Sequence, residues 1–277
     1  MVSFLNNINN ALTSVFDIVC LPFLSLEPMW ALTAISFASG IFLVWLFGKT
    51  SNQVHIRTVR DRIRGNLIGV RLFQHDIGVV LRLQQRIFGD TFRFMKLALI
   101  PMLIMMLPVV LIMAQLNLRF AVQAPLIGEA IVVTALVRGE ATLENPILLE
   151  APIGVTVETP PVKIHSSREI AWRVRVDQPG IHLLHLTVGN HSVDKQLVGG
   201  SGWQPIVQRR SGRGAIDTLL YPGEPPIATD SNVEMIEVAY PPRELSLFGL
   251  SIDWLIGFLL LSMAFGFGFK GILGVEV

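Results

Sequence analysis

Histidine, glutamate, cysteine and a glycine-rich run are the features of this chain whose chemistry could be catalytic or metal-binding. His182 and His185 form the most closely spaced pair of histidines. They fall in a run with strand-like alternation, in which an offset of three residues places two side chains on opposite faces of a sheet. Because ligands on opposite faces cannot share one zinc ion, no metal site is predicted.

The other candidate motifs each lack a residue that their chemistry needs. The run 199–202, Gly-Gly-Ser-Gly, is not followed by the Lys-Ser/Thr of a phosphate-binding loop. No Gly-x-Ser-x-Gly sequence of a serine hydrolase is present, and the single cysteine, Cys20, allows no intramolecular disulfide and no cysteine cluster. The glutamates are scattered, without the close pairing that acid–base catalysis needs: Glu129, Glu140, Glu144, Glu150 and Glu158. The sequence therefore predicts a protein that is not an enzyme and binds no cofactor.

The composition places the chain among membrane proteins. Of its 277 residues, 51% are hydrophobic and 16% are charged, and the mean hydropathy is +0.55. Soluble domains usually carry about 25% charged residues. The longest apolar run, Leu97–Leu118, contains no charge and exceeds the roughly 20 residues that cross a bilayer.

Three membrane spans are predicted, at residues 30–48, 97–118 and 247–270, followed by a short tail at 271–277. Trp30 and Trp45 lie near the two ends of the first span, where indole rings prefer the headgroup layer. Pro101 and Pro108 interrupt the second span. Proline frees backbone carbonyls that need neighbours in lipid, so a kink or a partner helix is expected there.

Residues 49–96 form a basic segment, whereas residues 1–48 contain no lysine or arginine. Positive residues in short loops stay on the cytoplasmic side. The segment is therefore predicted to be cytoplasmic, with the N-terminus outside and the C-terminus inside a bacterial inner membrane. The arginines expected to contact lipid or a partner are Arg57, Arg60, Arg62, Arg64, Arg71, Arg82, Arg86 and Arg93.

Two interpretations of the basic segment remain open. Its apolar residues recur at spacings of three and four, which predicts a hairpin of two amphipathic helices broken near residues 65–69. Such a hairpin could contact anionic lipid, a nascent chain or ribosomal RNA. Alternatively, its arginines simply meet the headgroups that flank the spans. No RNA-binding signature accompanies them, so lipids and protein subunits are the predicted partners and nucleic acid is not.

Residues 1–29 show helical spacing of apolar residues with asparagines between them. This pattern fits an amphipathic helix that lies in the membrane interface. It fits equally a helix packed on the protein's own spans or on a partner.

The second span is rich in methionine, with Met102, Met105 and Met106 between its two prolines. Thioether side chains are flexible and polarisable, which suits a surface for varied apolar partners. The candidate contact residues are these three methionines with Pro101 and Pro108. The alternative is that the methionines only fill a core or face lipid.

Residues 119–246 change to alternating patterns separated by turn residues. Strands are expected at 127–137, 153–157, 169–176, 182–188, 195–198 and 233–239. Trp172, Val174 and Val176 should point to one face, and Arg173 and Arg175 to the other. The predicted fold class is therefore membrane α plus β: an extracytoplasmic antiparallel β-sandwich, immunoglobulin-like in broad shape, inserted between the second and third spans.

Residues 31–118 show a first span, a basic helical region and a methionine- and proline-containing span. In this layout, and in the runs Arg60-Asp61-Arg62-Ile63-Arg64-Gly65-Asn66 and Phe94–Gln115, the chain resembles the minimal three-span members of the YidC/Oxa insertase superfamily. That superfamily includes the third subunit of the endoplasmic reticulum membrane complex. The resemblance implies a membrane protein insertase or assembly chaperone. Bacterial members usually place an arginine in the groove, and no predicted span here contains one.

Two functions follow from these features. The first is a non-enzymatic inner-membrane scaffold or accessory subunit that docks a partner through its β domain. The second is an insertase-like membrane chaperone, which the basic helices and the methionine-rich span favour. Three spans, a separate β domain and the lack of a catalytic cluster favour the first.

Overall fold

The computed structural model describes residues 2–24, 26–51, 53–212, 217, 219–247 and 249–275. The chain divides into two compact units. The β unit comprises Met1–Leu32 and Leu111–Trp254, and the helical unit comprises Thr33–Val110 and Leu255–Val277.

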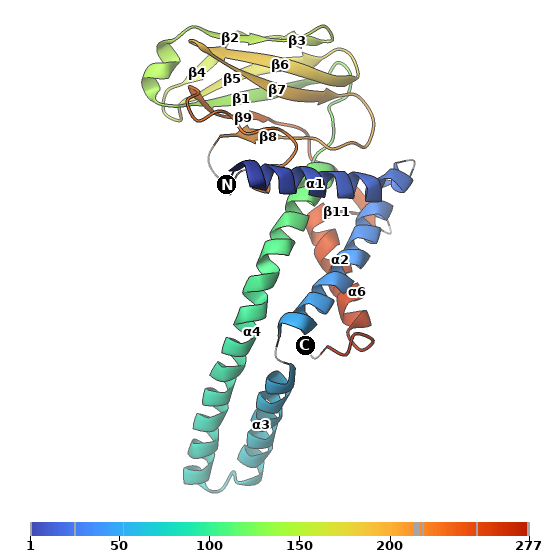
Figure 1. Ribbon diagram of the computed structural model, residues 1–277, viewed down its shortest axis with the longest axis vertical. Coiled ribbons are helices and arrows are strands. Elements are labelled where there is room, and N and C mark those ends of the chain that lie inside the picture. Colours follow the sequence, from blue (N-terminus) through green and yellow to red (C-terminus); the bar gives the residue numbers. More distant parts are fainter. Residues whose placement is uncertain are drawn as a thin grey trace. The chain divides into compact units, whose positions relative to one another are not determined.

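Helices account for most of the described chain outside the sheets (Figure 1). The main described helices are α1 (Val2–Cys20), η1 (Leu21–Phe23), α2 (Pro28–Thr50), α3 (Gln53–Leu72), α4 (Ile77–Phe120) and α6 (Trp254–Phe269). Among the described residues, α2 and α4 are long and apolar enough to cross a membrane, and α6 is a shorter apolar helix of 16 residues. The expected membrane helices at 30–48 and 97–118 therefore exist as helices of sufficient length.

The basic segment forms two helices, but the break between them differs from the expected one. Helix α3 continues through Gly65 and Gly69, and the chain reverses at residues 73–76 instead. Asp76 begins α4, because its Oδ1 accepts a hydrogen bond from Val79 N at 3.0 Å. A glycine inside a helix costs about 1 kcal/mol relative to alanine without ending the helix. The capping carboxylate therefore decided where the second helix starts.

Helix α4 runs for 44 residues and continues through Pro101 and Pro108. Its residues 77–110 belong to the helical unit and its last turns to the β unit. In the helical unit, α3 and the first half of α4 are antiparallel (Figure 1). A Cβ placed on Gly69 would lie 3.0 Å from Leu83 Cδ1, so the two helices touch there.

The third apolar run, expected as a helix from residue 247, begins as a β-hairpin. Strand β10 (Leu245–Leu247) pairs with β11 (Leu250–Ile252), and α6 starts only at Trp254. Gly249 has a φ of 82°, a conformation that favours glycine and permits the tight turn. Residues 249–253, which the predicted span included, are therefore not helical.

Besides the β10-β11 hairpin, the described part of the β unit contains two antiparallel sheets. The strands are β1 (Ala130–Val137), β2 (Ile147–Glu150), β3 (Val155–Val157), β4 (Val162–Ile164), β5 (Glu169–Val176), β6 (Gly180–Val188), β7 (His191–Gly199), β8 (Arg209–Ser211) and β9 (Val233–Val238). The larger sheet has the order β3-β5-β1-β9-β8, with β4 also paired to β5, and the smaller sheet has the order β2-β6-β7. A 3-10 turn, η2 (Glu140–Glu144), follows β1.

The two sheets share one hydrophobic core. Trp172 and Val174 of β5 are buried with Leu184 and Leu186 of β6. Arg173, between the two β5 residues, is exposed. The predicted alternation of β5 is thus confirmed, and its buried face points into the core.

Candidate functional site: an apolar groove in the helical unit

Small residues bring α2 and α6 into close contact. A Cβ on Gly40 would lie 2.5 Å from the Ser262 carbonyl oxygen, and one on Gly266 would lie 3.1 Å from Val44 Cγ2. Small residues let helix backbones approach closely in apolar surroundings. Phe37 adds edge-on ring contacts to Phe265 and Phe269, at centroid distances of 5.2 and 5.5 Å. These contacts fix α2 and α6 as a pair.

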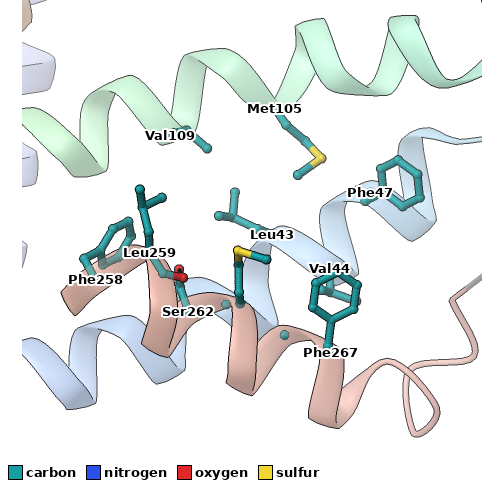
Figure 2. A pocket seen from close by; sticks show the side chains of 12 residues that line it. Leu43, Val44, Phe47, Met105, Val109, Phe258, Leu259, Ser262 and Phe267 are labelled. Atoms are coloured by element: carbon teal, nitrogen blue, oxygen red, sulfur yellow. Dashed lines mark hydrogen bonds between the residues drawn. The ribbon is translucent and has the colours of Figure 1, made fainter. Parts of the chain in front are cut away.

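A groove of about 280 Å³ lies where this pair faces α4. Figure 2 shows Met105 and Val109 of α4 facing side chains of α2 and α6 across it. The groove is lined by Gly40, Leu43, Val44, Phe47, Met105, Val109, Phe258, Leu259, Ser262, Met263, Gly266 and Phe267. Helices α2, α4 and α6 therefore all contribute side chains to the groove.

The lining of the groove is almost entirely apolar. None of its twelve residues is charged. Ser262 carries the one side-chain hydroxyl among them, and its Oγ donates a hydrogen bond to the Leu259 carbonyl at 3.2 Å. A polar group that entered would lose its hydration without finding a partner, at a cost of roughly 1–3 kcal/mol on the scale of protein mutations. The groove can therefore accept apolar side chains or acyl chains and disfavours charged segments.

Of the predicted contact residues of the second span, some line the groove and others do not. Met105 lines the groove, whereas Met102 and Met106 are 68% and 62% exposed and lie outside its lining. Pro101 is buried and Pro108 is half-buried, and neither lines the groove. Met263 of α6 does line it but was not predicted. The small residues around it, Ser262 and Gly266, are the sequence signal that could have indicated a helix contact there.

The predicted arginines are spread over the hairpin and do not line the groove. Seven of them are exposed and Arg60 is half-buried. Arg82 Nε donates a hydrogen bond to Gly78 O at 3.2 Å within its own helix. Arg93 lies 3.9 Å from Asp90, which is a weak surface contact. Most of this positive charge is thus displayed on the surface.

Sequence reasoning missed a buried cluster around Arg119. Arg119 is 2% exposed at the end of α4, in the β unit. Its Nη2 donates hydrogen bonds to Asp17 Oδ1 at 2.5 Å and to Thr13 O at 3.0 Å, and its Nη1 donates to Gln115 Oε1 at 2.8 Å. Trp203 Nε1 donates to the Arg119 carbonyl at 3.0 Å. No local pattern reveals the contact between Arg119 and Asp17, because the two residues are 102 positions apart.

This cluster fixes α1 against the end of α4, which α1 crosses in Figure 1. Burial raises the pKa of the Cys20 thiol at the end of α1, so the thiol stays protonated at neutral pH. Beyond the buried side of α1, Val15, Ile18 and Val19 form an exposed apolar side, and Asn10 and Ser14 an exposed polar side. Helix α1 therefore packs on the protein and also keeps an uncovered apolar strip.

The remaining residues that could take part in chemistry have structural roles. His182 is buried and His185 is exposed, as expected for opposite faces of β6. Among the described residues, no group of three histidines, cysteines or carboxylates could hold a metal ion. Lys195 and Glu224 form a fully buried ion pair at 3.2 Å, and Lys195 Nζ also donates to Val207 O at 2.7 Å. Burial lowers the pKa of Lys195, and the pair links β7 to the loop that follows β8.

Comparison with known proteins adds no relative. No protein-family model, no curated protein and no solved structure matches the chain.

Proposed function

We propose that this chain is a non-enzymatic, multi-pass subunit of a bacterial inner-membrane complex that binds an apolar transmembrane segment of a partner in its groove. The groove lined by α2, α4 and α6 carries the proposal, because it is apolar, uncharged and open. A segment without charges fits such a lining, and a polar segment does not. Scaffold and accessory functions both require this kind of stable contact within the membrane.

The proposed topology has three spans, formed by α2, the second half of α4 and α6. The basic hairpin is cytoplasmic, the β unit with its immunoglobulin-like sandwich is outside, and the C-terminus is inside. The arginine distribution supports this orientation. Helix α6, with only 16 residues, would span about 24 Å, so its flanking residues must complete the crossing.

Helix α1 is proposed to lie in the headgroup layer on the outer side of the inner membrane. Its exposed apolar side is continued by Leu21 and Leu24, and Trp30 follows at the start of α2. Exposed apolar side chains next to an interfacial tryptophan are typical of such helices. The ion pair between the buried Arg119 and the half-exposed Asp17 would hold α1 in this position.

Site-specific crosslinking tests the groove. A photo-reactive residue at Met105 should give adducts with a transmembrane segment of a partner in native membranes. The same residue at Met106, which lies outside the groove on the same helix, is the matched control and should give lipid adducts. Val109→Trp should fill the groove and remove the Met105 adduct. A Met105 probe that captures only lipid would refute the proposal.

An insertase-like chaperone is the second candidate, because the basic hairpin and the groove belong to the same unit. The two functions differ in the lifetime of the complex. A permanent subunit gives a Met105 adduct with one protein that persists after a pulse of labelled synthesis is chased. A chaperone gives adducts with several newly made membrane proteins that disappear during the chase.

Partner docking through the β unit is a further part of the scaffold proposal. The outer face of the smaller sheet exposes Leu148, Ile181 and Leu183, whereas isolated sheets usually present polar residues to water. Ile181→Glu with Leu183→Glu should release the docked subunit during purification in mild detergent. Val132→Glu, on the exposed face of the larger sheet, is the control and should retain it.

A further inference from the structure

A second pocket, of about 540 Å³, lies in the β unit. This volume is within the range of roughly 300–1,000 Å³ that is usual for small-molecule sites. The chain between η1 and α2 contributes Leu24 and Leu26 to the lining, and the glycine-rich run contributes residues 200–202. Arg243, just before β10, and Glu129, just before β1, also line it. We name this cavity the Arg243 pocket.

The two charged side chains of the Arg243 pocket are only partly satisfied by the protein. Arg243 is half-buried, and its Nε donates a hydrogen bond to Val122 O at 3.2 Å. Its Nη2 is buried and has no hydrogen-bond partner among the described residues. Glu129 is exposed, and its Oε2 accepts a hydrogen bond from Leu126 N at 2.9 Å. Each side chain therefore keeps hydrogen-bonding capacity for a ligand.

No carboxylate of the described chain compensates the charge of Arg243. Burial lowers the pKa of its guanidinium, and no neighbouring acid raises that pKa again. The group stays protonated at neutral pH, because arginine is the most basic side chain. A partly desolvated cation without a counter-charge is stabilised by an anionic ligand. The lining of the pocket therefore favours an anionic group beside Arg243.

The glycine-rich run supplies backbone donors to the same pocket. Gly200 and Gly202 have φ values of 94° and 138°, so the chain turns there, and Gly200 N donates to Pro125 O at 2.9 Å. In the described chain, no backbone acceptor bonds to Ser201 N or Gly202 N, and both residues are exposed. Successive amides left unpaired at a turn attract the oxygens of an anion. Together with Arg243, they suit a phosphate group.

Glu129 adds a requirement for positive charge in the ligand. Its carboxylate lines the pocket that Arg243 also lines, so a purely anionic ligand would be repelled by it. An ammonium group carries N–H donors for a carboxylate. A ligand that combines a phosphate with an ammonium group satisfies both side chains.

The apolar part of the lining indicates that such a ligand comes from the membrane. Leu24 and Leu26 are 53% and 50% exposed. In the proposed position of α1, on which this step rests, they lie at the headgroup layer and are covered by the first carbons of acyl chains. Phosphatidylethanolamine is a lipid whose headgroup carries both a phosphate and an ammonium group.

We propose that the Arg243 pocket binds the headgroup of one phosphatidylethanolamine molecule. Arg243 and the N–H groups of Ser201 and Gly202 hold its phosphate, Glu129 binds its ammonium group, and Leu24 with Leu26 contacts its acyl chains. The bound lipid would attach the β unit to the outer leaflet. This site is distinct from the groove, because none of these residues lines the groove.

Lipid titration of the purified full chain in detergent, followed by native mass spectrometry, tests the pocket. Short-chain phosphatidylethanolamine should bind at least fivefold more tightly than phosphatidylglycerol with the same acyl chains, which lacks the ammonium group. Inorganic phosphate and phosphoethanolamine without acyl chains should each bind at least tenfold more weakly than the lipid. Equal affinity for the two lipids, binding of inorganic phosphate as tight as that of the lipid, or no binding would each overturn the proposal.

Substitutions of the two charged residues provide the matched controls. Arg243→Gln should lower the affinity for phosphatidylethanolamine at least tenfold, whereas Arg138→Gln, at an exposed arginine outside the pocket, should leave it within about twofold. Glu129→Gln keeps an oxygen for Leu126 N, so it should preserve the fold and remove the preference for phosphatidylethanolamine without weakening phosphatidylglycerol. An unchanged preference in Glu129→Gln would contradict the proposal, even if Arg243→Gln failed to fold. This titration in detergent does not depend on the groove, so its failure and the failure of the Met105 crosslink are distinguishable.

Discussion

The β unit and the helical unit place their apolar and charged residues in opposite ways. In the β unit, apolar side chains fill a shared core and the outer face of β5 carries paired charges, such as Arg175 with Glu158 and Asp177 at 2.9 Å. In the helical unit, leucines and methionines of α4 are exposed and much of the positive charge is displayed on the hairpin. The first pattern is typical of a domain surrounded by water, and the second is typical of helices whose apolar side chains are covered by lipid or by another protein.

The comparison also shows two ways of using a charged residue. Arg119 in the β unit is buried and its hydrogen bonds join segments far apart in sequence. Arg82 in the helical unit is exposed and bonds only to its own helix. A buried guanidinium whose two terminal nitrogens are hydrogen-bonded to distant segments determines structure, whereas an exposed one is available for recognition.

Removing the largest core side chain should give the largest difference in unfolding free energy between a substitution in the β unit and one in the helical unit. Trp172→Ala leaves a cavity in the β core and should lower the free energy of unfolding by about 3–5 kcal/mol. Met106→Ala, at an exposed position of α4, should change it by less than about 0.5 kcal/mol. Chemical unfolding of the full chain in detergent, followed by circular dichroism, measures both. A similar loss in the two variants would show that Met106 is packed as closely as Trp172.

Neutralising Arg119 should have the next largest effect. Arg119→Met leaves Asp17 without its cation and should destabilise α1 docking by about 2 kcal/mol, less than for a fully buried pair because Asp17 is half-exposed. Faster proteolysis within α1, without cleavage in the sheets, is the expected readout. Adding Asp17→Asn to Arg119→Met should recover part of the loss. Arg82→Met, at the exposed site, serves as the control and should leave proteolysis unchanged.

Replacing glycine by alanine at two positions of the helical unit should change the free energy of unfolding in opposite directions. Gly40→Ala would force a Cβ to within 2.5 Å of the Ser262 carbonyl and should cost about 1–3 kcal/mol through displacement of α6. Gly65→Ala in α3 meets no atom within 4 Å and should stabilise the helix by about 0.5–1 kcal/mol. Thermal unfolding in detergent compares the variants. A destabilising Gly65→Ala would show that α3 has a neighbour on that side.

The smallest expected effect is a dependence of β-unit stability on alkaline pH. Tyr240 is buried and its hydroxyl oxygen accepts a hydrogen bond from Val198 N at 2.9 Å. Burial raises the pKa of this phenol above its ordinary value of 10.0. The stability that the neutral phenol supplies is therefore complete below pH 10 and falls as the pH rises above it, by at most about 1.4 kcal/mol per pH unit.

Unfolding of the full chain between pH 8 and pH 11 tests this dependence. Tyr240→Phe should cost about 1 kcal/mol at pH 8, since the Val198 N–H loses its acceptor. The variant should then approach the wild type as the pH rises above 10. Parallel curves for the two proteins would show that Tyr240 ionises as freely as an exposed tyrosine.

The local sequence pattern was sufficient to predict much of the fold. The alternation of residues 169–176 predicted β5 with its observed bounds, because a strand with one buried face must alternate. The apolar runs predicted helices at α2 and α4, and the basic periodicity predicted α3. Short strands such as β4 and β8 were missed, because three residues carry too little pattern to distinguish a strand from a loop.

The sequence by itself thus determined which stretches are apolar helices, which alternate as strands, and where positive charge gathers, since these depend on near neighbours. Only the tertiary structure decided that Met105 lines the groove while Met106 does not, that Met263 joins it, and that Arg119 pairs with Asp17. These facts depend on contacts between residues far apart in the chain. The rotation of one helix against another sets such contacts, and spacing along a single segment carries no record of it.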